Sequence, residues 1–445
     1  MFQFFKKITL LVFIFALLLS TEVHAQDTAA QDSLLDNATL ERVVQYAIAH
    51  QPLIQQSLLD EESARATIKS KLADWYPQIN LSANLQRNIE LQTLVTGLGT
   101  FRSGTNYTSA PQIYATQTIF NRDVLLAAKT SRVVKENTRQ TTESRKIDVT
   151  VNVTKAFYDF LATSQQIKVG QGDVIRLQQS LKTATDQYNA GLTDKTDYKR
   201  ATIALSNTLA SLNSNKELLK YKEEYLKSLM GYPVNAKLNI VYDTLQMERE
   251  IAMDTISQVD ITQRIEYKLF QTQRALQEAN VKYQKWSYLP SLNAYYYNIS
   301  YFFNNSFGQL YDTRYPNSYV GGTLIWPIFQ GFKRNANIKI QETNLKRLDW
   351  DITNLKNTVN SQHALALSTY RANLVNYNTL KQNMELAKEV YDVIQLQYRN
   401  GVKTYLEVIT SETDLRTARI NYFNSLYAVL ASKIDLQKAL GEIRY

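Results

Sequence analysis

The sequence predicts a mainly α-helical protein that also carries four β-strands suited to a membrane and that consists of two copies of one unit. Three observations support this prediction. The same landmarks recur at a nearly fixed offset, two long stretches contain no proline, and segments between them alternate polar and apolar residues. The first observation indicates a duplication, the second indicates long helices, and the third indicates strands.

The N-terminal segment, residues 1–25, is predicted to be a secretory signal peptide. The basic pair Lys6-Lys7 precedes a short apolar run from Ile8 to Leu19, and Val23-His24-Ala25 has the small-residue form of a cleavage site. The apolar run is shorter than the roughly 20 residues that a membrane helix needs. We therefore expect an exported protein.

The composition limits the possible chemistry. The chain has 445 residues and no cysteine, which excludes a disulfide framework and thiolate catalysis. The formal net charge of +9 is spread along the chain rather than clustered, so it is weak evidence for nucleic-acid binding. After residue 25 no stretch is apolar for long enough to be a membrane helix, so a membrane-spanning part would consist of strands.

Self-comparison of the chain indicates the duplication. Residues 75–79 align with 288–292 at an offset of 213, and residues 187–191 align with 397–401 at an offset of 210. A heptad series from Tyr198 to Leu226 aligns with one from Val408 to Leu436, which is typical of coiled-coil packing. Small residues that would let a neighbouring helix approach closely lie between the heptad positions of the second copy: Ser411, Ala418, Ser425, Ser432 and Ala439.

The placement of proline predicts the helices. None of the seven prolines lies between Phe120 and Gly231 or after Phe329. Residues 121–190 and 332–400 can therefore each form one helix, about 100 Å long at 1.5 Å per residue. A glycine then predicts a turn near residue 191 and near residue 401, each followed by a returning helix of about 35 residues. Gly170 and Gly172 are candidates for an interruption or bend in the first long helix.

The segments between the helices have the period of strands. Polar and apolar residues alternate over 78–91, and a second strand is expected at 107–119, after a loop rich in glycine and serine. The second copy has candidate strands at 291–303 and 319–329, and aromatic residues crowd these segments. Their lengths and aromatic flanks suit tilted membrane strands. Four strands cannot close a membrane barrel, because the smallest have about eight, so the chain is expected to oligomerise.

The order helix, strand, strand, long helix, glycine tip, returning helix, present twice after a signal peptide, resembles the outer membrane efflux protein family, the TolC-like channels. The resemblance covers about residues 40–441. Its marks are the junctions at Pro77, Pro290, Phe120-Asn121 and Phe329-Gln330-Gly331, the two Tyr-x-x-Gly tips, and Leu229-Met230-Gly231-Tyr232-Pro233 at the end of the first half. It implies a homotrimer in which each chain gives four strands to a twelve-stranded barrel in the outer membrane. The helices would form a coiled-coil barrel, a tunnel through the periplasm.

The resemblance also implies a division of the chain. Loops near 92–106 and 304–317 would face outside the cell. The expected segments are a signal peptide (1–25), an equatorial N-terminal segment (26–52), a first repeat (53–230), an equatorial linker (231–260), a second repeat (261–440) and a C-terminal tail (441–445).

The resemblance places the working residues at the two tips, in the periplasm. The network that closes the tunnel would consist of Thr196, Asp197, Tyr398 and Lys403, and Glu407 would contribute to a ring of carboxylates at the constriction. Thr410 stands where a second ring aspartate would be, so each chain would give one carboxylate. A periplasmic adaptor (membrane fusion protein) would dock at the tip residues Gly191, Leu192, Thr193, Gly401 and Val402.

The remaining partners follow from the same resemblance. An inner-membrane pump of the RND, ABC or MFS type would supply the energy, and outer membrane lipid would surround the strands. No cofactor, metal site or nucleic-acid partner is expected. The predicted function is the passive, gated exit duct of a tripartite efflux or type I secretion system, for small molecules or proteins.

Two other classes of protein compete with this interpretation. An enzyme is disfavoured, because after the signal peptide the chain has two histidines, His50 and His363, and none of the common catalytic motifs. A trimeric coiled-coil surface adhesin, or a structural outer membrane protein, is the alternative, since heptads alone would suit it. That alternative predicts one uninterrupted stalk, whereas this sequence has strand pairs between its helices.

Overall fold

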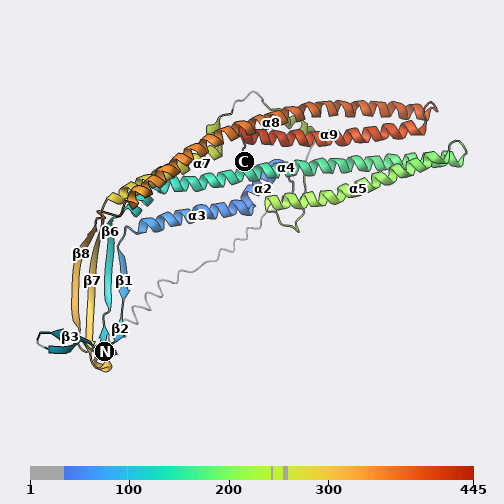
Figure 1. Cartoon of the computed structure of the whole chain (residues 1–445). Helices are drawn as coiled ribbons and strands as arrows, with labels where there is room; N and C mark the ends of the chain where they lie inside the picture. Colours follow the sequence, from blue (N-terminus) through green and yellow to red (C-terminus); the bar gives the residue numbers. More distant parts are fainter. Residues whose placement is uncertain (1–34, 98, 242–243, 254–258) are drawn as a thin grey trace.

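The structure is a computed structural model, which describes residues 35–97, 99–241, 244–253 and 259–445. The predicted signal peptide and parts of the two equatorial segments lie outside the described residues. The helices form a long rod, and the strands form a sheet that extends from one end of the rod at an angle (Figure 1). Across these described ranges, no helix combines the length and the apolar character needed to cross a bilayer.

The rod consists of two helical hairpins and shorter helices beside them. The hairpins are α4 with α5 and α8 with α9, and their long helices match the predicted 121–190 and 332–400 within one residue at each end. The helices and short 3₁₀ turns are α2 (Leu40–His50), α3 (Pro52–Ala73), α4 (Arg122–Asn189), α5 (Lys195–Met230), α6 (Thr244–Glu250), η1 (Ile261–Gln263), α7 (Ile265–Lys285), η2 (Trp286–Tyr288), η3 (Phe307–Gln309), α8 (Lys333–Arg399) and α9 (Tyr405–Leu440).

Helix α4 runs through Gly170 and Gly172, so the expected interruption there is wrong. A Cβ on Gly170 would lie 3.4 Å from Cδ1 of Leu212. This is an ordinary van der Waals distance, so the packing of α5 on α4 does not require a glycine at this position.

The sheet has four rows of strands, as predicted, although two rows are broken into shorter strands. The first row is β1 (Gln78–Ser82) with β2 (Leu85–Arg87), the second is β6 (Gln112–Phe120) with β5 (Tyr107–Ser109), and β7 (Ser291–Asn304) and β8 (Tyr315–Ile325) complete the sheet. All pairs are antiparallel, and β7 lies between the second row and β8. A separate hairpin of β3 (Gln92–Thr96) and β4 (Gly99–Ser103) occupies the predicted outer loop.

Three strand predictions need correction. The continuous strand 107–119 is interrupted at Ala110-Pro111, because proline has no N–H for the ladder, and the facing strand 78–91 is interrupted at Ala83-Asn84. The last strand lies at 315–325 instead of 319–329. Its end falls just before Trp326-Pro327, and Pro316 near its start is tolerated because β8 is at the edge of the sheet.

The two faces of the sheet differ in chemistry. Apolar side chains on one face are exposed, including Ile79 (73%), Leu81 (76%) and Val320 (79%). The opposite face carries a row of stacked tyrosines, in which the ring centroids of Tyr114 and Tyr297 are 5.3 Å apart and those of Tyr297 and Tyr319 are 5.2 Å apart. An exposed apolar face on an otherwise polar sheet is the pattern of strands in contact with lipid.

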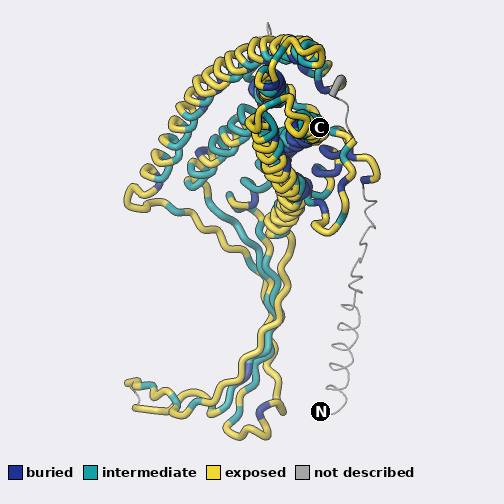
Figure 2. The backbone as a smooth tube through the Cα atoms, turned by 90° about the vertical axis from the view of Figure 1, so that its right-hand side faces the viewer, coloured by how far each residue is buried: buried dark blue, intermediate teal, exposed yellow. Residues whose placement is uncertain are grey.

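The main core lies midway along the rod, where α2, α6 and the ends of α5 and α9 pack on α4. Figure 2 shows that buried residues gather in the helical part and that the strands are mostly exposed or half-buried. Both returning helices end at a left-handed glycine, Gly231 and Gly441. A Cβ at Gly231 would lie 2.7 Å from the carbonyl oxygen of His50, so only glycine fits where α5 meets the end of α2.

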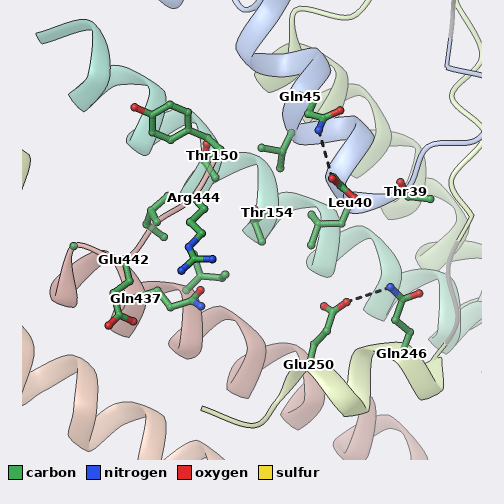
Figure 3. A pocket seen from close by; sticks show the side chains of 16 residues that line it. Thr39, Leu40, Gln45, Thr150, Thr154, Gln246, Glu250, Gln437, Glu442 and Arg444 are labelled. Atoms are coloured by element: carbon green, nitrogen blue, oxygen red, sulfur yellow. Dashed lines mark hydrogen bonds between the residues drawn. The ribbon is translucent and has the colours of Figure 1, made fainter. Parts of the chain in front are cut away.

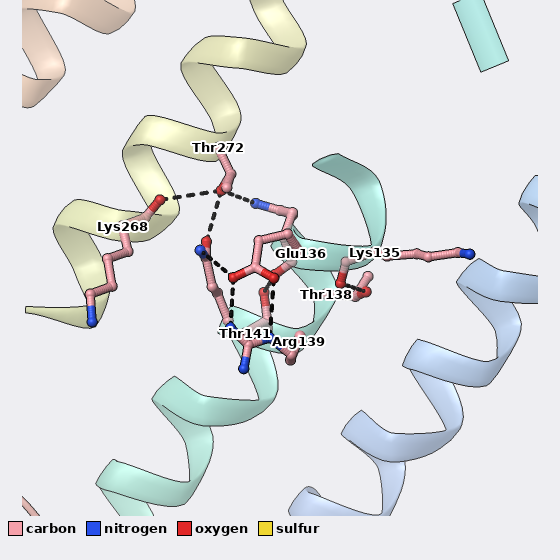
Figure 4. A network of polar contacts seen from close by, with 9 residues as sticks. Lys135, Glu136, Thr138, Arg139, Thr141, Lys268 and Thr272 are labelled. Carbon is pink, nitrogen blue, oxygen red and sulfur yellow. Dashed lines mark hydrogen bonds and ion pairs between the residues drawn. The ribbon is translucent and has the colours of Figure 1, made fainter. Parts of the chain in front are cut away.

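A polar network joins the two copies nearer to the sheet. The Asn137 side chain donates to Thr272 Oγ1 at 3.1 Å, and Thr272 Oγ1 donates to Gln140 Oε1 at 2.9 Å (Figure 4). Glu136 accepts from Gln140 and Arg139 on the same helix. These contacts fix the register of α4 against α7, so the two copies are held together by hydrogen bonds as well as by apolar packing.

Candidate functional site at the hairpin tips

The two hairpins turn at their far ends by the same backbone geometry. Gly191 has a φ of 73° and Gly401 a φ of 74°. In both tips the residue after the glycine donates its N–H to the carbonyl five positions back, at 2.9 Å. This pattern is the Schellman motif, in which a left-handed glycine satisfies the last carbonyls of a helix. Both copies therefore present the same tip shape.

The residues predicted for adaptor docking lie at these turns. Leu192 is 75% exposed and Val402 is 71% exposed, so each tip displays one apolar side chain. Thr193 is half-buried, although its Oγ1 is buried without a hydrogen-bond partner among the described residues. The two turns thus combine the same backbone geometry with an exposed apolar side chain.

Lys403 and Glu407 pair with each other at the start of α9. Lys403 Nζ lies 2.6 Å from Glu407 Oε1. Thr404 is the N-cap of α9, and its backbone N–H and hydroxyl donate to Glu407 Oε2 at 2.9 and 3.0 Å, which closes a capping box. The hydrogen bond from Lys403, followed by those from Thr404, lowers the pKa of Glu407 to about 2. This carboxylate is therefore ionised at any physiological pH.

Tyr398 joins the second hairpin to the first. Its hydroxyl donates to Gln187 Oε1 at 2.8 Å. Its ring centroid lies 5.8 Å from that of Tyr405, a buried side chain that packs with Ala184 and Ala201 of the first hairpin. Burial raises the pKa of both tyrosines, so both hydroxyls are protonated and Tyr398 can donate.

Thr196 and Asp197 lie opposite, in the first turn of α5. The N-cap Asp194 accepts from the backbone N–H of Thr196 at 3.2 Å, and the Thr196 side chain is exposed. Asp197 raises the pKa of Tyr398 and Tyr405 through its charge. In the part of the chain that the structure describes, however, its carboxylate makes neither a hydrogen bond nor an ion pair.

The structure therefore brings together part of the predicted network. Tyr398 and Asp197 are neighbours, but the hydrogen-bond partner of Tyr398 within the chain is Gln187, which the sequence analysis missed. A signal was available, because both tips contain a glutamine just before the tyrosine of the Tyr-x-x-Gly motif. Lys403 and Glu407 form a pair of their own instead of reaching the other hairpin.

A cavity of about 1250 Å³ with both polar and apolar lining residues lies elsewhere, midway along the rod. Its walls come from α2, α4, α6, α9 and the C-terminal residues, with Gln246 donating to Glu250 Oε1 at 3.4 Å on one side (Figure 3). None of the predicted gate residues lines it. Among the residues that the structure describes, no cluster of acidic or histidine side chains is suited to hold a metal ion.

The sequence matches a known protein family. The sequence model of the family described as "Outer membrane efflux protein" matches residues 43–232 and 268–442. Among curated proteins, the chain is 20% identical over 424 residues to the outer membrane protein TolC of Escherichia coli (strain K12), with 92% of this chain and 84% of that protein covered.

Solved structures with the same fold were also found. The chain matches the outer membrane channel CmeC of Campylobacter jejuni with a TM-score of 0.73 and 15% identity, covering 91% of this chain and 85% of that one. It matches the outer membrane protein VceC of Vibrio cholerae with a TM-score of 0.72 and 12% identity, covering 90% of this chain and 96% of that one. The predicted combination of long helical hairpins and strands is confirmed.

Proposed function

Because this chain belongs to the outer membrane efflux protein family and is an outer membrane channel component of a tripartite efflux system, we propose that its two hairpin tips are the gate of the channel. The observation that supports this assignment best is the contact of Tyr398 with Gln187, which ties the second hairpin to the first at the end of the rod. A channel of this kind opens when neighbouring hairpins separate, so a bond between them favours the closed state.

The working form is a homotrimer. In the described part of the chain β1 pairs only with β6 and β8 only with β7, so both edges of the sheet are open. Open edges beside an exposed apolar face are satisfied when β8 of one copy pairs with β1 of the next. Three copies would give twelve strands, which exceeds the roughly eight that the smallest membrane barrels need.

The exposed Leu192 and Val402 are the contacts for a periplasmic adaptor. Apolar side chains at the end of a polar rod support a contact surface there, and the shared turn geometry gives every hairpin of a trimer a similar knob. The partner pump is of the RND, ABC or MFS type, and the cargo is a small molecule or a secreted protein. A single coiled-coil stalk, as an adhesin would have, is not what the described strands and hairpins form.

The gate is tested by single-channel conductance of the purified trimer in planar bilayers. Tyr398→Phe removes one hydrogen bond between the hairpins, which is worth about 1 kcal/mol, so the ratio of open to closed states should rise roughly fivefold. Tyr188 stands at the equivalent position of the first tip and is 38% exposed, so Tyr188→Phe is the matched control and should leave the conductance unchanged.

Asp197→Ala tests the second predicted gate residue in the same assay. Its loss should raise the conductance as well, because Asp197 belongs to the proposed closing network. Equal conductance of Tyr398→Phe, Asp197→Ala and the parent channel would contradict the gate, while the channel function itself would still be measured by the parent current.

A further inference from the structure

A group of charged side chains is buried between the two hairpins, behind the tips. Asp173 and Arg176 lie on α4, and Glu412, Arg416 and Arg419 lie on α9. Asp173 is 1% exposed and Glu412 is 5% exposed. Arg176 precedes Gln187 by 11 residues, about 17 Å along the helix, so the group is separate from the gate contacts at the tips.

The arginines connect three helices at this level. Arg176 bonds Asp173 on its own helix and reaches across to α9, where its Nε lies 3.5 Å from Glu412 Oε1. Arg419 Nη1 lies 3.9 Å from Asp173 Oδ1, and Arg416 Nη1 donates to Thr208 Oγ1 of α5 at 2.6 Å. Contacts between the hairpins here are thus ionic as well as apolar.

The two carboxylates are poorly satisfied. Neither oxygen of Glu412 accepts a hydrogen bond from the described residues, and Asp173 Oδ2 accepts none. A buried carboxylate that lacks hydrogen bonds carries a large desolvation cost when it is ionised. Of the two carboxylates, Glu412 is therefore the one whose protonation would remove more of the desolvation cost.

The surroundings of Glu412 act on its charge in opposite directions. Burial raises the pKa of Glu412, and Arg176 and Arg416 offset only part of this effect. Tyr391 of α8 also faces the group, and its pKa is raised by burial and by the charge of Glu412. Burial lowers the pKa of Arg419, with Asp392 of α8 opposing this change. On balance the packed arrangement raises the pKa of Glu412 above its ordinary value, mainly through burial.

We propose that the Asp173–Arg176–Glu412 group is a second lock between the hairpins and that a proton on Glu412 keeps this lock shut. The inference rests on the proposed gate, since separation of α4 from α9 is the motion that opens it. When the hairpins part, Glu412 gains water and ionises without the cost of burial. A solvated Glu412 thus belongs to the open state, and a neutral, buried one to the closed state.

The direction of the pH dependence follows from linkage. The closed state has the higher pKa for Glu412, so it binds the proton more tightly than the open state. Acid therefore stabilises the closed state, and this stabilisation is lost as the pH rises through the raised pKa. Glu407 cannot cause this change, because its pKa of about 2 lies below the range in which Glu412 titrates.

Thiol labelling of the full-length trimer tests the lock without depending on current. The chain has no cysteine, so Ala184→Cys gives a single reporter, and Ala184 is 1% exposed where α4 contacts Tyr405 of α9. The rate of maleimide labelling is measured between pH 5 and 8 in the parent and in the Glu412→Gln background. The ratio of the two rates removes the intrinsic pH dependence of the thiol.

We expect the ratio of parent to Glu412→Gln rates to rise with pH, by up to tenfold for each unit by which burial raises the pKa. Glu389→Gln, the same change at an exposed position of α8, should behave as the parent does. A ratio that is flat, or that falls with pH, would overturn the proposal whether or not the tips gate the channel.

A second variant separates a proton lock from simple packing. Arg176→Gln removes the cation that lowers the pKa of Glu412 most, so the midpoint of the pH dependence should move to higher pH. A role in packing alone would change the labelling rate equally at every pH, and a midpoint that does not move would therefore also overturn the proposal.

Discussion

The two returning helices, α5 and α9, have the same length and the same place in their copies, yet they are buried very differently. Both span 36 residues and both carry the heptad series. In α9 all five heptad positions are buried, Val408, Leu415, Tyr422, Val429 and Leu436. Among the five equivalent positions of α5, only Leu212 and Leu226 are buried. Duplication preserved the helix, and the surroundings of the two copies then diverged.

The small residues between the heptad positions of α9 account for part of the difference. Ser425 and Ser432 are buried in α9, which packs along both α8 and α4. At the equivalent positions α5 has Asn215 and Lys222. The Lys222 side chain donates to Asp159 Oδ1 of α4 at 2.8 Å. Large polar side chains prevent close approach of a second helix. The side of α5 that carries Ile203 and Tyr221 is accordingly exposed.

The largest expected effect is a core truncation in α9 compared with its equivalent in α5. Leu415→Ala removes a side chain that is 2% exposed and should lower the free energy of unfolding by about 2–5 kcal/mol. Leu205→Ala changes a half-buried position and should cost well under half as much. Urea unfolding in detergent, followed by circular dichroism at 222 nm, measures both. Equal losses would mean that assembly buries α5 as fully as α9.

A smaller effect is expected where the small residues set the helix spacing. Ser425→Leu inserts volume at a position that is 3% exposed and should cost about 1–3 kcal/mol through overpacking. Asn215→Leu makes a similar change at the equivalent, partly exposed position of α5 and should be close to neutral. The same unfolding assay decides, and a neutral Ser425→Leu would show that small residues are not what brings the helices together.

The sequence predicted the long helices better than it predicted the strands. Helix ends are local, since Asn121 and Gly191 cap α4 through neighbouring residues, so they can be read from short motifs. The breaks in the strand rows depend on contacts across the sheet, where the backbone N–H of Ala110, next to Pro111, donates to the carbonyl oxygen of Asn84. The Asp173–Arg176–Glu412 group was missed because Glu412 lies more than 230 residues after the other two and meets them only when α4 packs on α9.

The smallest effect concerns the first turns of α5 and α9, where Asp197 and Glu407 are equivalent. Glu407 has the extra methylene that lets it close the capping box and pair with Lys403, whereas Asp197 has no such bond in the described chain. Glu407→Gln loses the ion pair and should speed trypsin cleavage after Lys403 about twofold, as expected for one exposed pair on a helix. Asp197→Asn should leave cleavage after Lys195 unchanged in a single chain. Faster cleavage at Lys195 in the assembled protein would instead require a partner for Asp197 from another copy, and it would place this aspartate at the contact between protomers.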